Sequence, residues 1–74
     1  MSSGLPVVSG KETVEALQRG GFKHVSQRGS HVKLRHPEGS TVIVPLHREL
    51  ARGTLRSILR QADLTVEAFN DLRR

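Results

Sequence analysis

The sequence predicts a small α+β domain with the element order α-β-β-β-α. A strictly alternating segment, His31–Arg35, and a β-branched segment, Thr41–Val44, lie between two stretches with helical apolar spacing. Tight-turn residues separate the strands, so neighbouring strands should run in opposite directions. We therefore expect a three-stranded antiparallel sheet with the helices on one face, and a small additional helix at the end. The 74 residues are expected to form a single domain, 1–74.

The first helix is predicted by its end signals. Ser9 followed three residues later by Glu12 is the pattern of a capping box, which predicts a helix over residues 10–19. Leu17 belongs to its apolar side. Gly20-Gly21 ends the helix, since glycine adopts the left-handed C-terminal conformation without steric cost.

Three strands are expected after this helix. Arg28-Gly29-Ser30 should form the first turn, and the segment from His36 to Gly39 the second, because proline and glycine there favour a tight connection. Pro45 should end the last strand, because proline cannot donate to the hydrogen-bond ladder. The predicted strands are Phe22–Gln27, His31–Arg35 and Thr41–Val44.

The C-terminal part predicts two helices after a loop, Leu46–Arg52. Gly53-Thr54 should open the first, whose apolar side would cover the sheet. Thr65 is the expected N-cap of the second, with Leu64 packing against Phe69 across its first turn. The apolar residues of the first of these helices are Leu55, Ile58, Leu59 and Ala62.

The alternation in the second strand predicts two different faces. Val32 and Leu34 should point toward the helices, while His31, Lys33 and Arg35 should share the opposite, open face. That face would combine a side chain that exchanges protons near neutral pH with two fixed positive charges. Such a set suits a polyanion with a cleavable phosphodiester. From spacing alone, an exposed histidine without a task remains an alternative.

The composition points to an anionic partner. Twelve Lys and Arg against seven Asp and Glu give a formal net charge of +5, although a basic surface alone identifies no ligand. No cysteine is present, so neither a disulfide nor a thiolate metal site is expected. The N-terminus has no secretory pattern and no apolar run is long enough for a bilayer, so a cytoplasmic protein without membrane association is expected.

RNA carries its own nucleophile, the 2′-hydroxyl, so a ribonuclease needs little beyond a proton-transfer group and positive charge. His31 is the candidate catalytic residue. Lys33, Arg35 and Arg28 are the candidate phosphate-binding residues, and Ser30 could add a hydrogen bond to a phosphate oxygen. With two Phe, no Tyr and no Trp, contacts to the RNA backbone are expected rather than base stacking.

Other patterns are less informative. The spacing of His24, His36 and His47 fits no metal-binding pattern, so no metal or other cofactor is expected and these histidines should lie at the surface or in turns. Arginines recur at every fourth position, which fits either a phosphate-binding stripe or a solvated helix face. These arginines are Arg48, Arg52, Arg56 and Arg60.

The chain resembles the HicA family of toxins from type II toxin–antitoxin systems over nearly its whole length. The order and spacing of several short segments carry the resemblance: Leu5-Pro6 before Ser9-Gly10, Gly20-Gly21-Phe22, Gly29-Ser30-His31, His36-Pro37, Pro45-Leu46-His47, and Gly53 to Ala62.

This resemblance implies a fold like that of the double-stranded-RNA-binding domain and an endoribonuclease that cleaves mRNA. The family's catalytic strand histidine corresponds to His31, and the family's partner is a HicB-like antitoxin that masks the active site. Two alternatives remain: a non-catalytic double-stranded-RNA-binding module of the same fold, and an interaction protein whose basic face docks an acidic partner.

Overall fold

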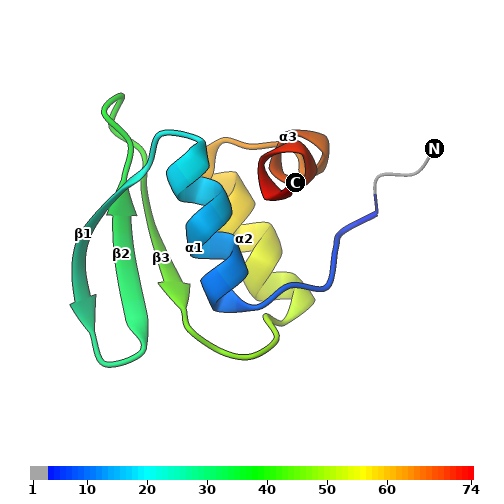
Figure 1. Ribbon diagram of the computed structural model, residues 1–74, viewed down its shortest axis with the longest axis horizontal. Coiled ribbons are helices and arrows are strands. Elements are labelled where there is room, and N and C mark those ends of the chain that lie inside the picture. Colours follow the sequence, from blue (N-terminus) through cyan, green and yellow to red (C-terminus); the bar gives the residue numbers. More distant parts are fainter. Residues whose placement is uncertain (1–3) are drawn as a thin grey trace.

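The computed structural model describes residues 4–74, which form a three-stranded antiparallel sheet with helices on one side of it (Figure 1). This confirms the predicted α+β order. The expected irregular lead-in, residues 1–8, contains no helix or strand from Gly4 onward, and its first three residues lie outside the described part. The elements are α1 (Gly10–Arg19), β1 (Lys23–Arg28), β2 (His31–Arg35), β3 (Thr41–Pro45), α2 (Arg52–Ala62) and α3 (Val66–Arg73).

Helix α1 begins at the predicted capping box. The backbone N–H of Glu12 donates to Ser9 Oγ (3.0 Å), and the backbone N–H of Ser9 donates to Glu12 Oε1 (2.8 Å). The hydrogen bond from Ser9 favours the ionised carboxylate, so the pKa of Glu12 lies below its ordinary value of 4.5. The helix bounds are those predicted from the sequence.

Strand β2 lies in the middle of the sheet, between β1 and β3. The β1–β2 hairpin has Gly29 and Ser30 as its two loop residues, and Gly29 has φ of 58°. Glycine adopts this conformation without the penalty that a Cβ atom brings. Strand β1 also contains a bulge between His24 and Ser26, which leaves Val25 without a direct partner on β2.

Several predicted boundaries are wrong by one residue. Strand β1 begins at Lys23, because Phe22 still belongs to the end of α1: its N–H donates to Leu17 O (3.0 Å) and its side chain is buried. Arg28 pairs with His31 and so belongs to β1, not to the turn.

The other two shifts concern β3 and α2. Strand β3 includes Pro45, which an edge strand tolerates because its outer side has no ladder partner. Helix α2 begins at Arg52, one residue before the predicted Gly53, and its N-cap Ala51 makes no side-chain hydrogen bond.

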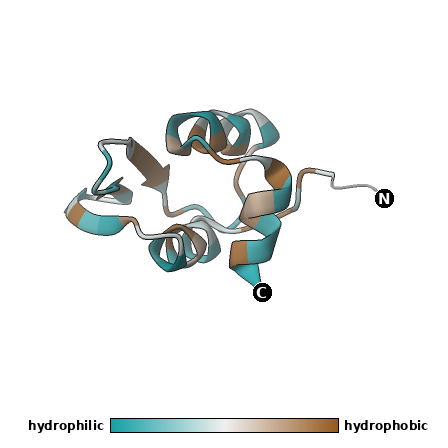
Figure 2. Ribbon diagram, turned by 90° about the horizontal axis from the view of Figure 1, so that it is seen from above, coloured by the Kyte–Doolittle hydropathy of each residue, from teal (hydrophilic) through white to brown (hydrophobic). Residues whose placement is uncertain are grey.

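The core lies between the sheet and the helices, as predicted. Helices α1 and α2 pack against β3, and α3 packs against α1. Figure 2 shows the alternation of hydrophobic and hydrophilic residues along the helices that this packing requires. The buried apolar residues from the strands and from α1 and α2 include Val32, Leu34, Val42, Val44, Leu17, Leu55, Ile58 and Leu59.

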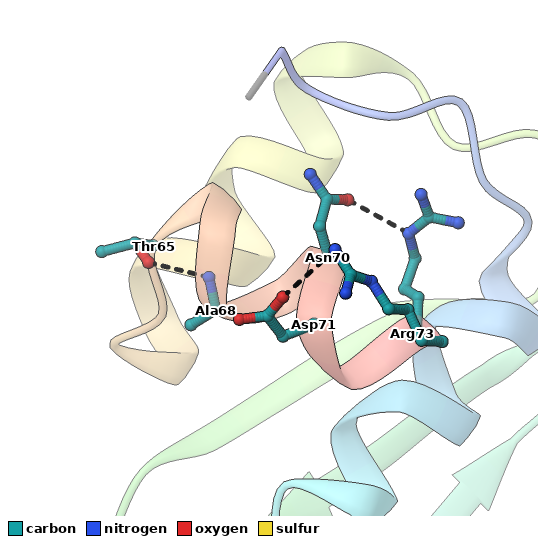
Figure 3. A network of polar contacts seen from close by, with 6 residues as sticks. Thr65, Ala68, Asn70, Asp71 and Arg73 are labelled. Atoms are coloured by element: carbon teal, nitrogen blue, oxygen red, sulfur yellow. Dashed lines mark hydrogen bonds and ion pairs between the residues drawn. The ribbon is translucent and has the colours of Figure 1, made fainter. Parts of the chain in front are cut away.

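Helix α3 is anchored by Phe69, which has no exposed surface, and Leu64 packs against the same core. Thr65 is its N-cap, as predicted, with Oγ1 accepting the N–H of Ala68 (3.0 Å; Figure 3). Further contacts near its end are exposed and contribute little to stability. They are Arg73 Nε to Asn70 Oδ1 (3.2 Å) and Arg74 Nη2 to Asp71 Oδ1 (3.6 Å).

Candidate functional site

The helices cover one face of the sheet and leave the other face open (Figure 1). Val32 and Leu34 are buried, while His31, Lys33 and Arg35 are exposed, so the predicted division of β2 into two faces is confirmed. Directly opposed residues of an antiparallel sheet share a face, with Cβ atoms about 5 Å apart. The opposed sets are Arg28–His31–Pro45, Ser26–Lys33–Ile43 and Lys23–Arg35–Thr41.

A shallow depression of about 330 Å³ lies at one end of this open face. Its lining consists of one histidine, two cationic side chains, one hydroxyl and one half-exposed aliphatic side chain. The depression thus offers a proton-transfer group, positive charge and a small apolar surface within one site. The lining residues are Ser26, Arg28, His31, Lys33 and Ile43.

The bulge in β1 determines which β1 side chains reach this depression. Lys23 and Ser26 are three residues apart, so in a regular strand they would point to opposite faces. The extra residue Val25 shifts the register, and both then pair with outward residues of β2. Arg28 follows two residues after Ser26 and is therefore also on the open face, directly opposite His31.

The open face carries uncompensated positive charge. None of the strand residues 23–28, 31–35 and 41–45 is acidic. Within residues 4–74, no ion pair involves Arg28, Lys33 or Arg35. A phosphate placed on this face would therefore meet cations without competition from carboxylates.

Hydrogen bonds support the hairpin loop next to His31 from the β1 side and from the β3 side. The hairpin loop before it is supported by Gln27 Nε2, which donates to Gly29 O (3.0 Å). On the β3 side, the backbone N–H of Leu46 donates to Ser30 O (2.7 Å). Strand β2 also pairs with a neighbouring strand on each side, and His31 is directly opposite Arg28 on β1 and Pro45 on β3.

The structure brings together only some of the residues predicted to bind RNA or to catalyse its cleavage. Arg28 and Lys33 line the depression with His31. Ser30 lies in the exposed hairpin loop and does not line it, because the loop lies beyond the last pair of the ladder. Arg35 is four residues further along β2, about 13 Å away at the rise of an antiparallel strand, and does not line it either.

Two lining residues, Ser26 and Ile43, are missing from the sequence-based set. The alternation of Val42 and Val44 around Ile43 is the signal that could have placed Ile43 on the open face. For Ser26 no such signal exists, because its orientation depends on the bulge.

The other histidines lie where they were expected, at the surface or in a turn. His36 packs its ring against Phe22, with ring centroids 5.1 Å apart, and its Nδ1 accepts the N–H of Glu38 (3.1 Å). His24 and His47 are exposed. In the part of the chain that the structure describes, no three His, Asp or Glu side chains gather so as to hold a metal ion.

The arginines at every fourth position do not belong to this site. They are exposed, and three of them lie on α2, in the helical layer (Figure 1). Arg56 and Arg60 border a separate depression whose lining includes Leu5 and Leu64. No helix within residues 4–74 is both long and apolar enough to cross a membrane.

A family model for the HicA toxin of bacterial toxin–antitoxin systems matches residues 10–64. The chain belongs to this family. The matched segment runs from the start of α1 past the end of α2, and so it contains the whole sheet with the depression at His31. A comparison with curated proteins gave no match. Toxins of this family generally cleave mRNA and are paired with an antitoxin.

Proposed function

We propose that this HicA-family toxin is an endoribonuclease that cleaves mRNA without a metal ion, with His31 as the catalytic residue. The observation that supports this proposal is the position of His31. It is exposed on the central strand, in a depression that it shares with Arg28 and Lys33, and the strands contain no carboxylate.

In the proposed reaction, the 2′-hydroxyl of one nucleotide attacks the adjacent phosphorus atom. A new 2′-O–P bond forms, the P–O5′ bond breaks, and the products are a 2′,3′-cyclic phosphate and a free 5′-hydroxyl. His31 either accepts the proton of the 2′-hydroxyl or donates a proton to the leaving 5′-oxygen, and a solvent water molecule takes up or supplies the other proton. The Arg28 guanidinium and the Lys33 ammonium group stabilise the negative charge that builds up on the phosphoryl oxygens. Ser26 can donate a hydrogen bond to the same oxygens.

The same face would be the binding surface for a HicB-like antitoxin. An antitoxin that covers the depression would exclude mRNA from His31 and neutralise the toxin. We therefore expect a cognate antitoxin and RNA to compete for the toxin, and we expect the reaction to occur in the cytoplasm, where mRNA is present. Simultaneous binding of both would contradict this part of the proposal.

The decisive experiment compares His31→Ala with wild type and with His24→Ala. His24 is a matched control, because it is an exposed histidine of the same hairpin that does not line the depression. Expression of wild type and His24→Ala should arrest growth and fragment mRNA, whereas His31→Ala should do neither. Since acid–base catalysis by one side chain contributes roughly 10²–10⁴-fold, the cleavage rate of purified His31→Ala should fall by that factor. Unchanged cleavage by this variant would disprove the role of His31.

Two further measurements test the chemistry. Cleavage should continue in EDTA, and a strict requirement for divalent metal would contradict the proposed mechanism. A substrate with 2′-O-methyl groups should bind but remain intact, because its nucleophile is blocked. If wild type binds unmodified RNA tightly and leaves it uncut, the protein is instead a non-catalytic RNA-binding module.

A further inference from the structure

A second pair of cations lies on the open face, at the end remote from His31. Lys23 on β1 and Arg35 on β2 are directly opposed in the ladder. Like charges in this position repel each other at Cβ distances of about 5 Å and destabilise the sheet. Both side chains are exposed and both line a depression together with Pro37. Within the described chain neither forms an ion pair with a carboxylate.

This pair is distinct from the site at His31. The depression at His31 contains neither Lys23 nor Arg35, and the depression at Lys23 and Arg35 does not contain His31. Lys33 lies between the two, on the same face of β2. The separation of about 13 Å along β2 is too long for both pairs to hold one phosphate group.

We propose that Lys23 and Arg35 form a second phosphate-binding subsite, which holds a non-reacting backbone phosphate of the RNA strand that lies across the open face. This inference rests on the proposed ribonuclease function. An arginine guanidinium can bind two oxygens of one phosphate, and a lysine adds a point charge beside it. The negative charge of a bound phosphate offsets the repulsion between the two side chains. This would explain why two cations lie opposite each other without a carboxylate beside them.

The separation of the two subsites determines what substrate they fit. A stacked strand advances about 3.4 Å per nucleotide, so about 13 Å corresponds to about four steps, and to fewer steps in an extended strand. The phosphate at Lys23 and Arg35 is thus several nucleotides away from the scissile one. A dinucleotide would reach only the depression at His31, whereas a longer single strand would occupy both subsites.

The experiment measures binding of RNA oligonucleotides that carry 2′-O-methyl groups, so that cleavage plays no part. The variant is Lys23→Gln/Arg35→Gln. The control is Lys11→Gln/Arg74→Gln, which removes the same charge from exposed positions on α1 and at the C-terminus. Affinities for a dinucleotide and for a decanucleotide are measured from about 50 to 200 mM salt, the range over which phosphate contacts are most evident. Thermal melting shows whether each variant is folded.

For the decanucleotide, the Lys23→Gln/Arg35→Gln variant should bind more weakly, and its salt slope should fall by roughly 0.7, the value for one phosphate of a single strand that is no longer neutralised. Dinucleotide affinity should be that of wild type, as should both affinities of the control. An unchanged salt slope for the decanucleotide, or an equal loss for the dinucleotide, would overturn the second subsite. If the binding results are as expected but wild type does not cleave unmodified RNA, the proposed ribonuclease function is wrong, whereas the second phosphate-binding subsite still stands.

Discussion

Gly10 lies directly against the carbonyl oxygen of Pro45, so closely that a Cβ atom on Gly10 would overlap it. The N–H of Gly10 also donates to His47 O (2.9 Å), and the N–H of Leu46 donates to Ser30 O (2.7 Å). One short backbone segment after β3 therefore connects the first turn of α1 with the hairpin that carries His31. The packing of α1 thereby helps to fix the position of the candidate catalytic strand.

Gly10→Ala should destabilise the protein by about 1–3 kcal/mol, because the atom in the way belongs to the backbone and cannot rotate aside. Urea denaturation measures the change in the free energy of unfolding. Gly53→Ala is the matched control, since Gly53 is also helical and a Cβ there would meet no atom within 4 Å. That variant should be neutral or more stable, by about 0.5–1 kcal/mol. Equal stabilities of the two variants would contradict the close contact.

The capping box of α1 should make stability depend on pH through Glu12. The folded-state pKa of this carboxyl is lowered by the hydrogen bond from the Ser9 N–H, so its contribution is complete above the ordinary pKa of 4.5. The contribution is lost as the pH falls through the lowered, folded-state pKa. Melting temperatures of wild type and Glu12→Gln should therefore differ at pH 7 and converge in acid. A constant difference across this range would contradict a role for the ionised carboxylate, and Glu15→Gln on the same helix serves as the control.

Gly29→Ala should destabilise the hairpin by about 1–2 kcal/mol, through the backbone alone. Gly29 has φ of 58°, and a Cβ atom there would meet nothing within 4 Å, so no side-chain clash is involved. Gly29→Asn should cost less, since asparagine tolerates the left-handed conformation better than alanine does. Thermal melting of both variants compares the two costs. A greater loss for Gly29→Asn would show that space, not backbone conformation, limits this position.

How far the sequence predicts the structure depends on whether a feature is local. The start of α1 follows from Ser9 and Glu12 and its end from Gly20-Gly21, and the two faces of β2 follow from its alternation, since each depends on residues a few positions apart. The bulge at Val25 depends on how β1 aligns with β2, so the place of Ser26 in the depression could not be predicted. The distance between Arg35 and His31 follows from the rise per residue of a strand. Which cations line the same depression depends on the pairing between strands, so the sequence does not predict it.

The arginines of α2 provide a test of which face of the molecule binds RNA. Arg56→Gln/Arg60→Gln and Arg28→Gln/Lys33→Gln each remove two positive charges, so the two variants have the same net charge. Only Arg28 and Lys33 line the depression at His31, whereas Arg56 and Arg60 belong to the helical layer.

We expect the Arg28→Gln/Lys33→Gln variant to lose affinity for a single-stranded, 2′-O-methylated RNA, with a decrease in salt slope of roughly 0.7, because both side chains neutralise the same phosphate. The Arg56→Gln/Arg60→Gln variant should keep the slope of wild type, because its charges lie on a solvated helix face. Fluorescence anisotropy at several salt concentrations measures both slopes. A lower slope for the α2 variant alone would assign RNA binding to the helical side, and it would remove the electrostatic reason for placing the scissile phosphate beside His31.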